Sequence, residues 1–263
     1  MPSETLPGGA WRPDWQASPR VGALMSTRQG GVSVAPWDSL NLGVAVGDDV
    51  AAVAENRRRF AQALGARPVW LRQVHGSSVL HLQHGHFDVA PMEADAAWTD
   101  EPGLACTVQV ADCLPVLMAA PEGRAVAAAH AGWRGLAGGL VEAALASLCE
   151  GAHCAPQDVA VWLGPCIGPR QFEVGAEVLE AFGAAPADPD PQLFVTSAPR
   201  EGMPRWRAHL PRLTSLRLQR AGVRHIDGGS WCTVEDRLRF FSYRRDGAAT
   251  GRQAAVVWIE DGT

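Results

Sequence analysis

Apolar residues gather in short runs that glycine, proline and charged residues separate along most of the chain. The most apolar runs lie in the middle, and their lack of polar alternation is typical of strands buried on both faces. These runs predict strands at residues 104–110, 115–120 and 125–130. Shorter runs bounded by turn residues predict further strands at residues 21–27, 69–74, 78–82, 159–163, 223–226, 240–243 and 254–259.

Helix signals fall between these strands. Asp48 and Asp49 precede an amphipathic segment that stops at Gly65, which predicts a helix over residues 50–64. Apolar spacing predicts other helices over residues 138–149, 177–182 and 209–220. Residues 183–205, dominated by Pro, Ala and Asp, predict a mobile loop. Because strands and helices interleave without strict βαβ alternation, we predict an α/β fold of α+β-like character, a single domain with mixed central sheets flanked by helices.

Composition narrows the classes of function. The chain of 263 residues has 47% hydrophobic and 19% charged residues, which is enough for a sizeable core. Its net charge is −5 and it has no basic stripe, so nucleic acid is not an expected partner. No apolar run approaches the roughly 18–20 residues that cross a bilayer, so a membrane is not expected either. The oligomeric state stays open.

The amino terminus lacks the basic start and apolar stretch of a secretory signal. We therefore expect a cytoplasmic protein, in which thiols stay reduced. The six cysteines are then buried, catalytic or metal-bound rather than joined in a disulfide framework.

Three segments place a metal-binding side chain at the end of an apolar run, next to a Gly or Pro turn. They are His75 in QVHG, Cys113 in ADCLP and His130 in AHAGWRG. Strand ends that feed loops are where α/β proteins place their sites. Two imidazoles and a thiolate suit zinc and leave a fourth position for water or substrate. The sequence therefore predicts a catalytic metal centre, with zinc as its ion.

The same residue types admit other interpretations. A single histidine at a strand end is often only a hydrogen-bonded structural residue, and a single cysteine is often part of a core. Cys113 is also a candidate thiolate nucleophile with His130 as its base, the pairing that cysteine hydrolases use. The three side chains are far apart in the sequence, so their spacing does not decide among these interpretations.

Candidate anion-binding groups accompany these segments. The turn at residues 132–135 opens a helix, and its backbone N–H groups together with Arg134 suit a phosphate. Arg28, before a QGG turn, and Arg244, after FFSY, are similar candidates. The competing interpretation is an ordinary glycine-rich turn with surface arginines.

Taken together, the segments resemble a known family. The chain resembles the bacterial laccase-domain proteins, also called multicopper polyphenol oxidases, purine nucleoside phosphorylases and peptidoglycan editing factors. The resemblance covers nearly the whole chain after about residue 18, so we expect an amino-terminal extension at 1–17 and one catalytic domain at 18–263. The matching stretches are TRQGGVS at 27–33, SLNLG at 39–43, VGDD at 46–49, NR at 56–57, QVHG at 73–76, ADC at 111–113, AHAGWRG at 129–135, GP at 164–165, FEVG at 172–175 and FFSYRR at 240–245.

The resemblance implies that His75, Cys113 and His130 are the metal ligands, with zinc as the usual ion and copper claimed for the oxidase activity. It also implies a fold similar to the catalytic domain of cytotoxic necrotizing factor toxins. Those toxins use a Cys–His pair that maps onto Cys113 and His130, which are then catalytic residues. Asn41, within the SLNLG stretch, joins Arg28, Arg134 and Arg244 as a candidate substrate-binding residue.

The activities implied by the resemblance are phosphorolysis of adenosine, inosine and methylthioadenosine, and deamination of adenosine. We therefore expect a zinc-dependent enzyme whose partners are a purine nucleoside and phosphate. One alternative is a copper polyphenol oxidase, although eight histidines without paired spacing are few for multicopper chemistry. The other is a metal-free Cys–His hydrolase that removes L-serine from peptidoglycan precursors.

Overall fold

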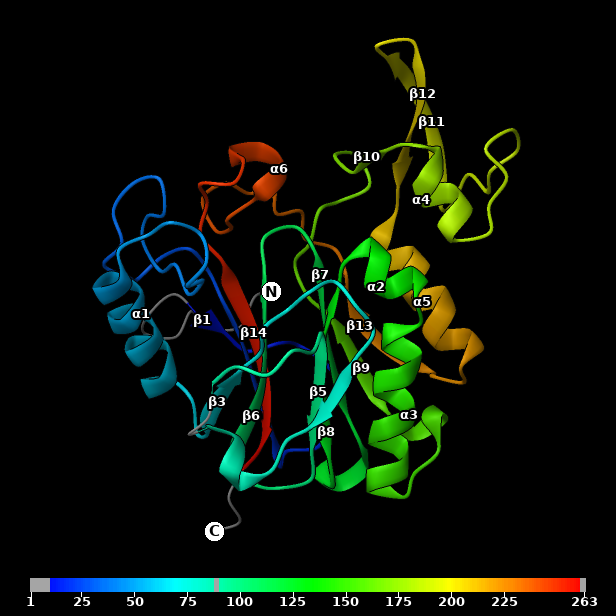
Figure 1. The fold of residues 1–263 in the computed structure, drawn as a ribbon. Coiled ribbons are helices and arrows are strands. Elements are labelled where there is room, and N and C mark those ends of the chain that lie inside the picture. Colours follow the sequence, from blue (N-terminus) through cyan, green and yellow to red (C-terminus); the bar gives the residue numbers. More distant parts are fainter. Residues whose placement is uncertain (1–9, 88–89, 261–263) are drawn as a thin grey trace.

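Two large β-sheets lie face to face between layers of helices in the computed structural model, which describes residues 10–87 and 90–260 (Figure 1). The strands are β1 (Ala10–Trp11), β2 (Val21–Ser26), β3 (Arg67–Trp70), β4 (Val79–His81), β5 (Ala96–Thr99), β6 (Leu104–Val110), β7 (Leu114–Ala119), β8 (Val126–Ala131), β9 (Ala160–Leu163), β10 (Glu173–Val174), β11 (Phe194–Arg200), β12 (Met203–Ala208), β13 (His225–Gly228) and β14 (Gln253–Ile259). The α-helices are α1 (Val50–Gln62), α2 (Trp133–Ala137), α3 (Leu140–Ala152), α4 (Ala176–Ala181), α5 (Leu210–Arg220) and α6 (Tyr243–Asp246), with short 3₁₀ turns η1 (His84–Phe87), η2 (Pro121–Gly123) and η3 (Pro156–Asp158).

Both large sheets are mixed. One has five strands in the order β1-β2-β14-β6-β3, and the other has six in the order β13-β9-β7-β8-β5-β4. The pairs β3–β6, β4–β5 and β13–β9 are parallel, and the remaining neighbours are antiparallel. A small antiparallel sheet, β10-β12-β11, stands apart from the two large ones (Figure 1). The predicted mixed α/β domain with flanking helices is confirmed.

The two-sided burial of the central strands explains their unbroken apolar runs. In β7, Val116 and Met118 pack toward α3, whereas Leu117 and Ala119 face the five-stranded sheet. Because side chains alternate between the two faces of a strand, a strand covered on both sides needs apolar residues at every position. Strand β6 has the predicted bounds, and β7 and β8 are each displaced by one residue.

Helix α1 covers the outer face of the five-stranded sheet. Its N-cap is Asp49, whose side chain accepts a hydrogen bond from the Ala52 N–H, as the sequence predicted. Phe60 of α1 packs with Val256 and Trp258 of β14. Helices α3 and α5 cover the outer face of the six-stranded sheet, so the layers run helix, sheet, sheet, helix (Figure 1).

The predicted loop at 183–205 is wrong in its second half. Strands β11 and β12 form a hairpin there that projects away from the sandwich (Figure 1). Glu201 and Gly202, both at positive φ, make its turn, and Phe194 and Trp206 anchor its base in the core. Most other residues of the hairpin are exposed, so it lacks the apolar pattern by which strands are found in a sequence.

The predicted strand at 240–243 is also wrong. Phe240 and Phe241 are buried, but the side chain of Gln253 takes the place of a neighbouring strand. It accepts from the Phe241 N–H at 2.8 Å and donates to the Phe241 carbonyl at 3.1 Å. A buried backbone needs hydrogen-bond partners of some kind, and an apolar run does not reveal which kind it has.

The boundary of the domain at residue 18 stays a prediction. Residues 1–9 of the expected extension lie outside the described residues, while Ala10 and Trp11 pair with β2 as an edge strand. Similarity to the cytotoxic necrotizing factor domain also stays a prediction. Among the described residues, no helix has the length and apolar character needed to cross a bilayer.

Candidate metal centre

Three separate segments meet at the end of the sandwich where α2 begins (Figure 1). His75 lies in the turn after β3, Cys113 lies directly before β7, and His130 lies near the end of β8. One nitrogen of each imidazole and the thiol sulfur all lie within 4.8 Å of one another. His75 is exposed, Cys113 is half-buried and His130 is buried. The structure thus brings together the three side chains predicted from the sequence, at the edge of the core and open to solvent.

The geometry suits a metal ion between these groups. The distance from Cys113 Sγ to His75 Nε2 is 3.7 Å, and the two imidazole rings meet edge to face at 4.8 Å between centroids. Two ligands of a tetrahedral zinc, one thiolate and one imidazole, lie about 3.6 Å apart, given typical bond lengths of about 2.3 Å and 2.0–2.1 Å. The donor set and the spacing of Cys113 and His75 therefore fit zinc.

Asp95, which is not among the residues predicted from the sequence, organises the centre. Its buried carboxylate accepts from His130 Nδ1 at 2.9 Å through Oδ1. It also accepts the backbone N–H groups of Val74 at 3.2 Å, His75 at 2.9 Å and Gly76 at 2.7 Å. One side chain thus fixes the turn that carries His75 and orients the ring of His130. A carboxylate on Nδ1 leaves Nε2 of that ring for the metal.

Backbone strain accompanies this arrangement. His75 has φ of 61° and Asp112, beside Cys113, has φ of 101°, both in the left-handed region that residues other than glycine rarely adopt. The Asp95 carboxylate holds the first turn. The Asp112 carboxylate holds the second, since it accepts from Thr233 Oγ1 and from the Arg244 N–H, each at 2.6 Å. Side-chain hydrogen bonds therefore stabilise the two turns from which the ligands project.

The charges of the metal-free centre favour a thiolate beside an imidazolium. Burial opposes ionisation of Cys113, but the neighbouring His130 and His75 lower the pKa of its thiol to about 6. Burial likewise opposes the charge on His130, but Cys113 and Asp95 raise the pKa of its imidazole to about 9. Burial also opposes ionisation of Asp95, and hydrogen bonds from His130 and the backbone nevertheless hold the pKa of its carboxyl below the usual value. A thiolate is the form of cysteine that binds metals and attacks electrophiles.

Gly132 leaves room for the ligands. A Cβ at this position would stand 2.9 Å from His75 Cδ2 and 3.1 Å from Cys113 Sγ. Both distances are shorter than ordinary van der Waals contacts, so any side chain larger than the hydrogen atom of glycine would displace a ligand.

We expect Gly132→Ala to weaken metal binding about tenfold or more, because the methyl group pushes two ligands apart. Metal affinity measured by competition with a chromogenic chelator checks this result. Gly85→Ala is the matched control, since a Cβ at Gly85 meets no atom within 4 Å. Equal metal affinity in both variants would contradict the steric role of Gly132.

The arginines predicted to bind substrate differ in how many bonds they already make to other groups of the protein. Arg28 forms an ion pair with Asp38 at 3.2 Å, and Arg244 donates to the carbonyls of Gln171 and Glu173. Arg134 is exposed, with its guanidinium 4.3 Å from the centroid of the adjacent Trp133 ring. The structure does not gather these arginines into one site, and their roles toward substrate stay predictions.

Asn41 is fully buried and bonds only to protein groups. Its amide donates to Asp48 at 2.8 Å and to the Gly43 carbonyl at 3.2 Å. Its oxygen accepts the N–H groups of Gly43 and Arg252, each at 2.9 Å. Any effect of Asn41 on substrate therefore passes through the residues that it holds.

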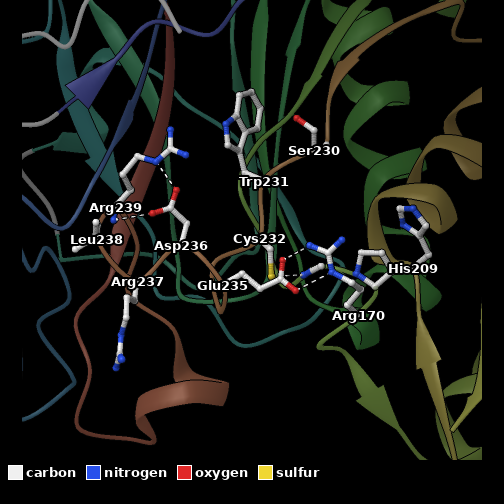
Figure 2. A pocket seen from close by; sticks show the side chains of 13 residues that line it. Arg170, His209, Ser230, Trp231, Cys232, Glu235, Asp236, Arg237, Leu238 and Arg239 are labelled. Carbon is white, nitrogen blue, oxygen red and sulfur yellow. Dashed lines mark hydrogen bonds and ion pairs between the residues drawn. The ribbon is translucent and has the colours of Figure 1, made fainter. Parts of the chain in front are cut away.

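A separate cleft of about 870 Å³ lies between the turn at 168–170 and the segment 229–239 (Figure 2). Its charged groups are largely paired with each other, Arg170 with Glu235 at 3.0 Å and Arg239 with Asp236. The thiol of Cys232 accepts the Gly168 N–H at 3.2 Å. Thr233, next to Cys232 of the cleft, bonds to Asp112 of the centre.

Comparison with known proteins shows which family this chain resembles, independently of the geometry of the centre. Residues 22–260 match the sequence model of a family described as multi-copper polyphenol oxidoreductase laccase. The chain is 50% identical over 253 residues to a Pseudomonas aeruginosa protein named purine nucleoside phosphorylase, a match that covers 96% of this chain and 99% of the relative. It is 45% identical over 249 residues to the Escherichia coli K12 purine nucleoside phosphorylase YfiH, with 94% and 97% covered.

Solved structures give the same picture of the fold. A Neisseria meningitidis protein superposes with a TM-score of 0.86 at 41% sequence identity, over 96% of this chain and 100% of that chain. YlmD from Geobacillus stearothermophilus superposes with a TM-score of 0.86 at 33% identity, over 96% and 97%. The likeness in sequence and in fold thus extends over nearly the whole chain.

Proposed function

Because the chain belongs to the multi-copper polyphenol oxidoreductase laccase family, we propose that it is a purine nucleoside phosphorylase with a zinc ion held by His75, Cys113 and His130. The observation that carries the proposal is the 50% identity, over 96% of the chain, to a relative that bears the phosphorylase name. The three converging ligand atoms support an active centre in this chain itself.

Phosphorolysis sets two requirements on the site. The C1′–N9 bond of the nucleoside breaks and a C1′–O bond to phosphate forms, while the bonding electron pair leaves on N9. The proton of hydrogenphosphate ends on the departing base, so atoms and charge balance. The protein must therefore hold an anion beside the sugar and stabilise a purine as it leaves.

The residues of the centre suit such a reaction. His75, Cys113 and His130 would hold the ion, and Asp95 would keep His130 in the required tautomer. A zinc ion with three protein ligands supplies a Lewis-acidic position and lowers the pKa of bound water toward about 7. We propose adenosine, inosine and methylthioadenosine as substrates, with deamination of adenosine as a second reaction. Phosphate and the nucleoside are the proposed partners, and a cytoplasmic location stays a prediction.

The donor set favours zinc over copper oxidase chemistry. Oxidation by several coppers requires several clusters of ligands, and within the described ranges His75, Cys113 and His130 form the one cluster of metal-binding side chains with converging ligand atoms. The family description therefore carries less weight for the reaction of this chain than its site residues do.

A metal-free cysteine hydrolase is the second candidate. Asp95 bonds to Nδ1 of His130, and Cys113 lies beside His130 with a lowered thiol pKa of about 6. This is the order of groups in which a carboxylate orients a base and the base activates a nucleophile. Hydrolysis that removes L-serine from a peptidoglycan precursor is a reaction that such a group of residues could catalyse. The two candidates differ in whether activity needs a metal.

We expect the purified protein to release purine base from inosine or adenosine only when phosphate is present. Removal of metal with a chelator is expected to lower this turnover at least about tenfold, and added zinc is expected to restore it. Base release followed by chromatography, with elemental analysis of the same sample, checks both results. Absence of turnover of either nucleoside after zinc loading would contradict the proposed function. Phosphate-dependent turnover that survives complete metal removal would contradict the role of zinc, whereas metal-independent release of L-serine from a peptidoglycan precursor would favour the hydrolase.

A further inference from the structure

Arg252 lies beside the turn that carries Cys113. It directly precedes β14, whose first residue, Gln253, pairs with Val110 at the end of β6. Because these strands are antiparallel, the chain before Gln253 runs alongside the chain after Val110, which leads into Asp112 and Cys113. The tertiary structure therefore brings the carboxyl-terminal segment next to the metal centre.

The surrounding protein holds Arg252 firmly. Its N–H donates to Asn41 Oδ1 at 2.9 Å, and its carbonyl accepts the Leu42 N–H at 3.0 Å. Its Nη1 donates to the carbonyls of Thr250 at 2.9 Å and Gly251 at 3.0 Å. Gly43 lies under the side chain, where a Cβ would stand 2.7 Å from Arg252 Cγ. Nε and Nη2 make no hydrogen bond to another described residue, so they are free to donate to a ligand.

The charge of Arg252 is not neutralised by an ion pair. The residue is half-buried, and in the part of the chain that the structure describes no carboxylate lies within 4.0 Å of its guanidinium. The ionisable groups whose charges act on it are Cys113, Asp112 and Tyr243, and Cys113 and Asp112 already belong to the centre or to its support. Placing a guanidinium out of water without a counterion is unfavourable unless a ligand supplies the negative charge.

Other arginines near the centre meet this description less well. Arg28 is paired with Asp38, and Arg244 is occupied by two carbonyls and stacks over Phe172. Arg57, also half-buried, donates to the Leu42 carbonyl and lies 4.0 Å from the centroid of the Trp70 ring. Arg252 combines free donors, a guanidinium without an ion pair to a described residue and a position near Cys113.

We propose that Arg252 binds the phosphate co-substrate next to the metal centre. The inference rests on the proposed phosphorolysis and adds the residue that holds the anion. Free guanidinium N–H groups make strong hydrogen bonds to phosphate oxygens. Arg252 would keep one phosphate oxygen directed at C1′ while the C1′–N9 bond breaks, with the phosphate proton passing to the base. Asn41 then acts as a positioning residue, because it holds the backbone of Arg252.

Steady-state phosphorolysis of inosine by the zinc-loaded full chain tests this assignment. Arg252→Gln is expected to raise KM for inorganic phosphate about 10- to 100-fold while KM for inosine changes less than about threefold. Arg252→Lys keeps the charge but loses the planar donor pair, so it is expected to recover part of the phosphate affinity. Arg124→Gln is the control, since Arg124 is exposed at the opposite end of β8 from His130. Thermal unfolding of each variant shows whether it is folded.

The possible outcomes separate the two proposals. Folded Arg252→Gln with the phosphate KM of the wild type would overturn the role of Arg252 and leave the phosphorylase in place. A parallel rise in both KM values would also overturn it, because it indicates a disturbed centre rather than a lost anion site. A wild-type protein with no phosphate-dependent turnover would instead overturn the proposed function.

Discussion

Cys113→Ser is expected to lower kcat/KM for phosphorolysis at least about 1,000-fold and to remove the bound metal. A serine hydroxyl stays protonated near neutral pH, so it is a much weaker zinc ligand and a much weaker nucleophile than the thiolate that it replaces. The neighbouring histidines lower the pKa of the Cys113 thiol to about 6, which makes the thiolate available in the native protein. Activity assays together with elemental analysis of purified protein check the result.

His75→Ala decides which role Cys113 has. If the centre binds a metal, this variant loses activity and metal to a degree similar to Cys113→Ser, because it removes one of three ligands. If Cys113 is a nucleophile with His130 as its base, His75→Ala retains much of the activity. Cys154→Ser is the control for a cysteine substitution, since Cys154 is half-buried beyond the far end of α3. Full activity of Cys113→Ser would refute both roles.

Asp95→Asn is expected to weaken metal binding about 10- to 100-fold and to lower the free energy of unfolding by about 2–4 kcal/mol. The carboxylate accepts four hydrogen bonds, two at each oxygen. An amide nitrogen accepts none, so one pair of buried donors loses its partner whichever way the amide turns. Either the turn that carries His75 or the ring of His130 is then misplaced. Chelator competition on the folded variant and denaturant unfolding measure the two effects separately.

Asp100→Asn is the matched control for this substitution. Asp100 also bonds a histidine, His81, at 3.0 Å, but this pair is exposed. Exposed pairs of this kind contribute little to stability, so we expect a change below about 1 kcal/mol and normal metal affinity. If Asp95→Asn resembled Asp100→Asn in both measurements, Asp95 would not be the residue that organises the centre.

Much of the architecture follows from local patterns in the chain. Unbroken apolar runs predicted β6, β7 and β8 nearly to the residue, and Asp49 with the periodic segment after it predicted α1. The errors fall where a strand lacks a local apolar pattern or where a buried segment bonds to a distant side chain. Strand β5 is short and Ala-rich, and the β11–β12 hairpin is mostly exposed, so neither has the apolar period that marks a strand. The buried stretch at Phe240 and Phe241 bonds to a side chain twelve residues away, which no local pattern encodes.

The sequence by itself determined the chemistry that the centre can have. His75, Cys113 and His130 each stand at the end of an apolar run, and residue type alone makes them ligands for zinc or partners in thiol catalysis. Tertiary structure alone decided that they converge, and which groups support them. Asp95 precedes the unpredicted β5, and its buried carboxylate binds a turn about twenty residues earlier and a histidine 35 residues later. Arg252 reaches the centre because β14 pairs with β6 across more than 140 residues of chain. Ligand identity is a property of single residues, whereas orientation and uncompensated charge depend on contacts that form only when distant segments pack together.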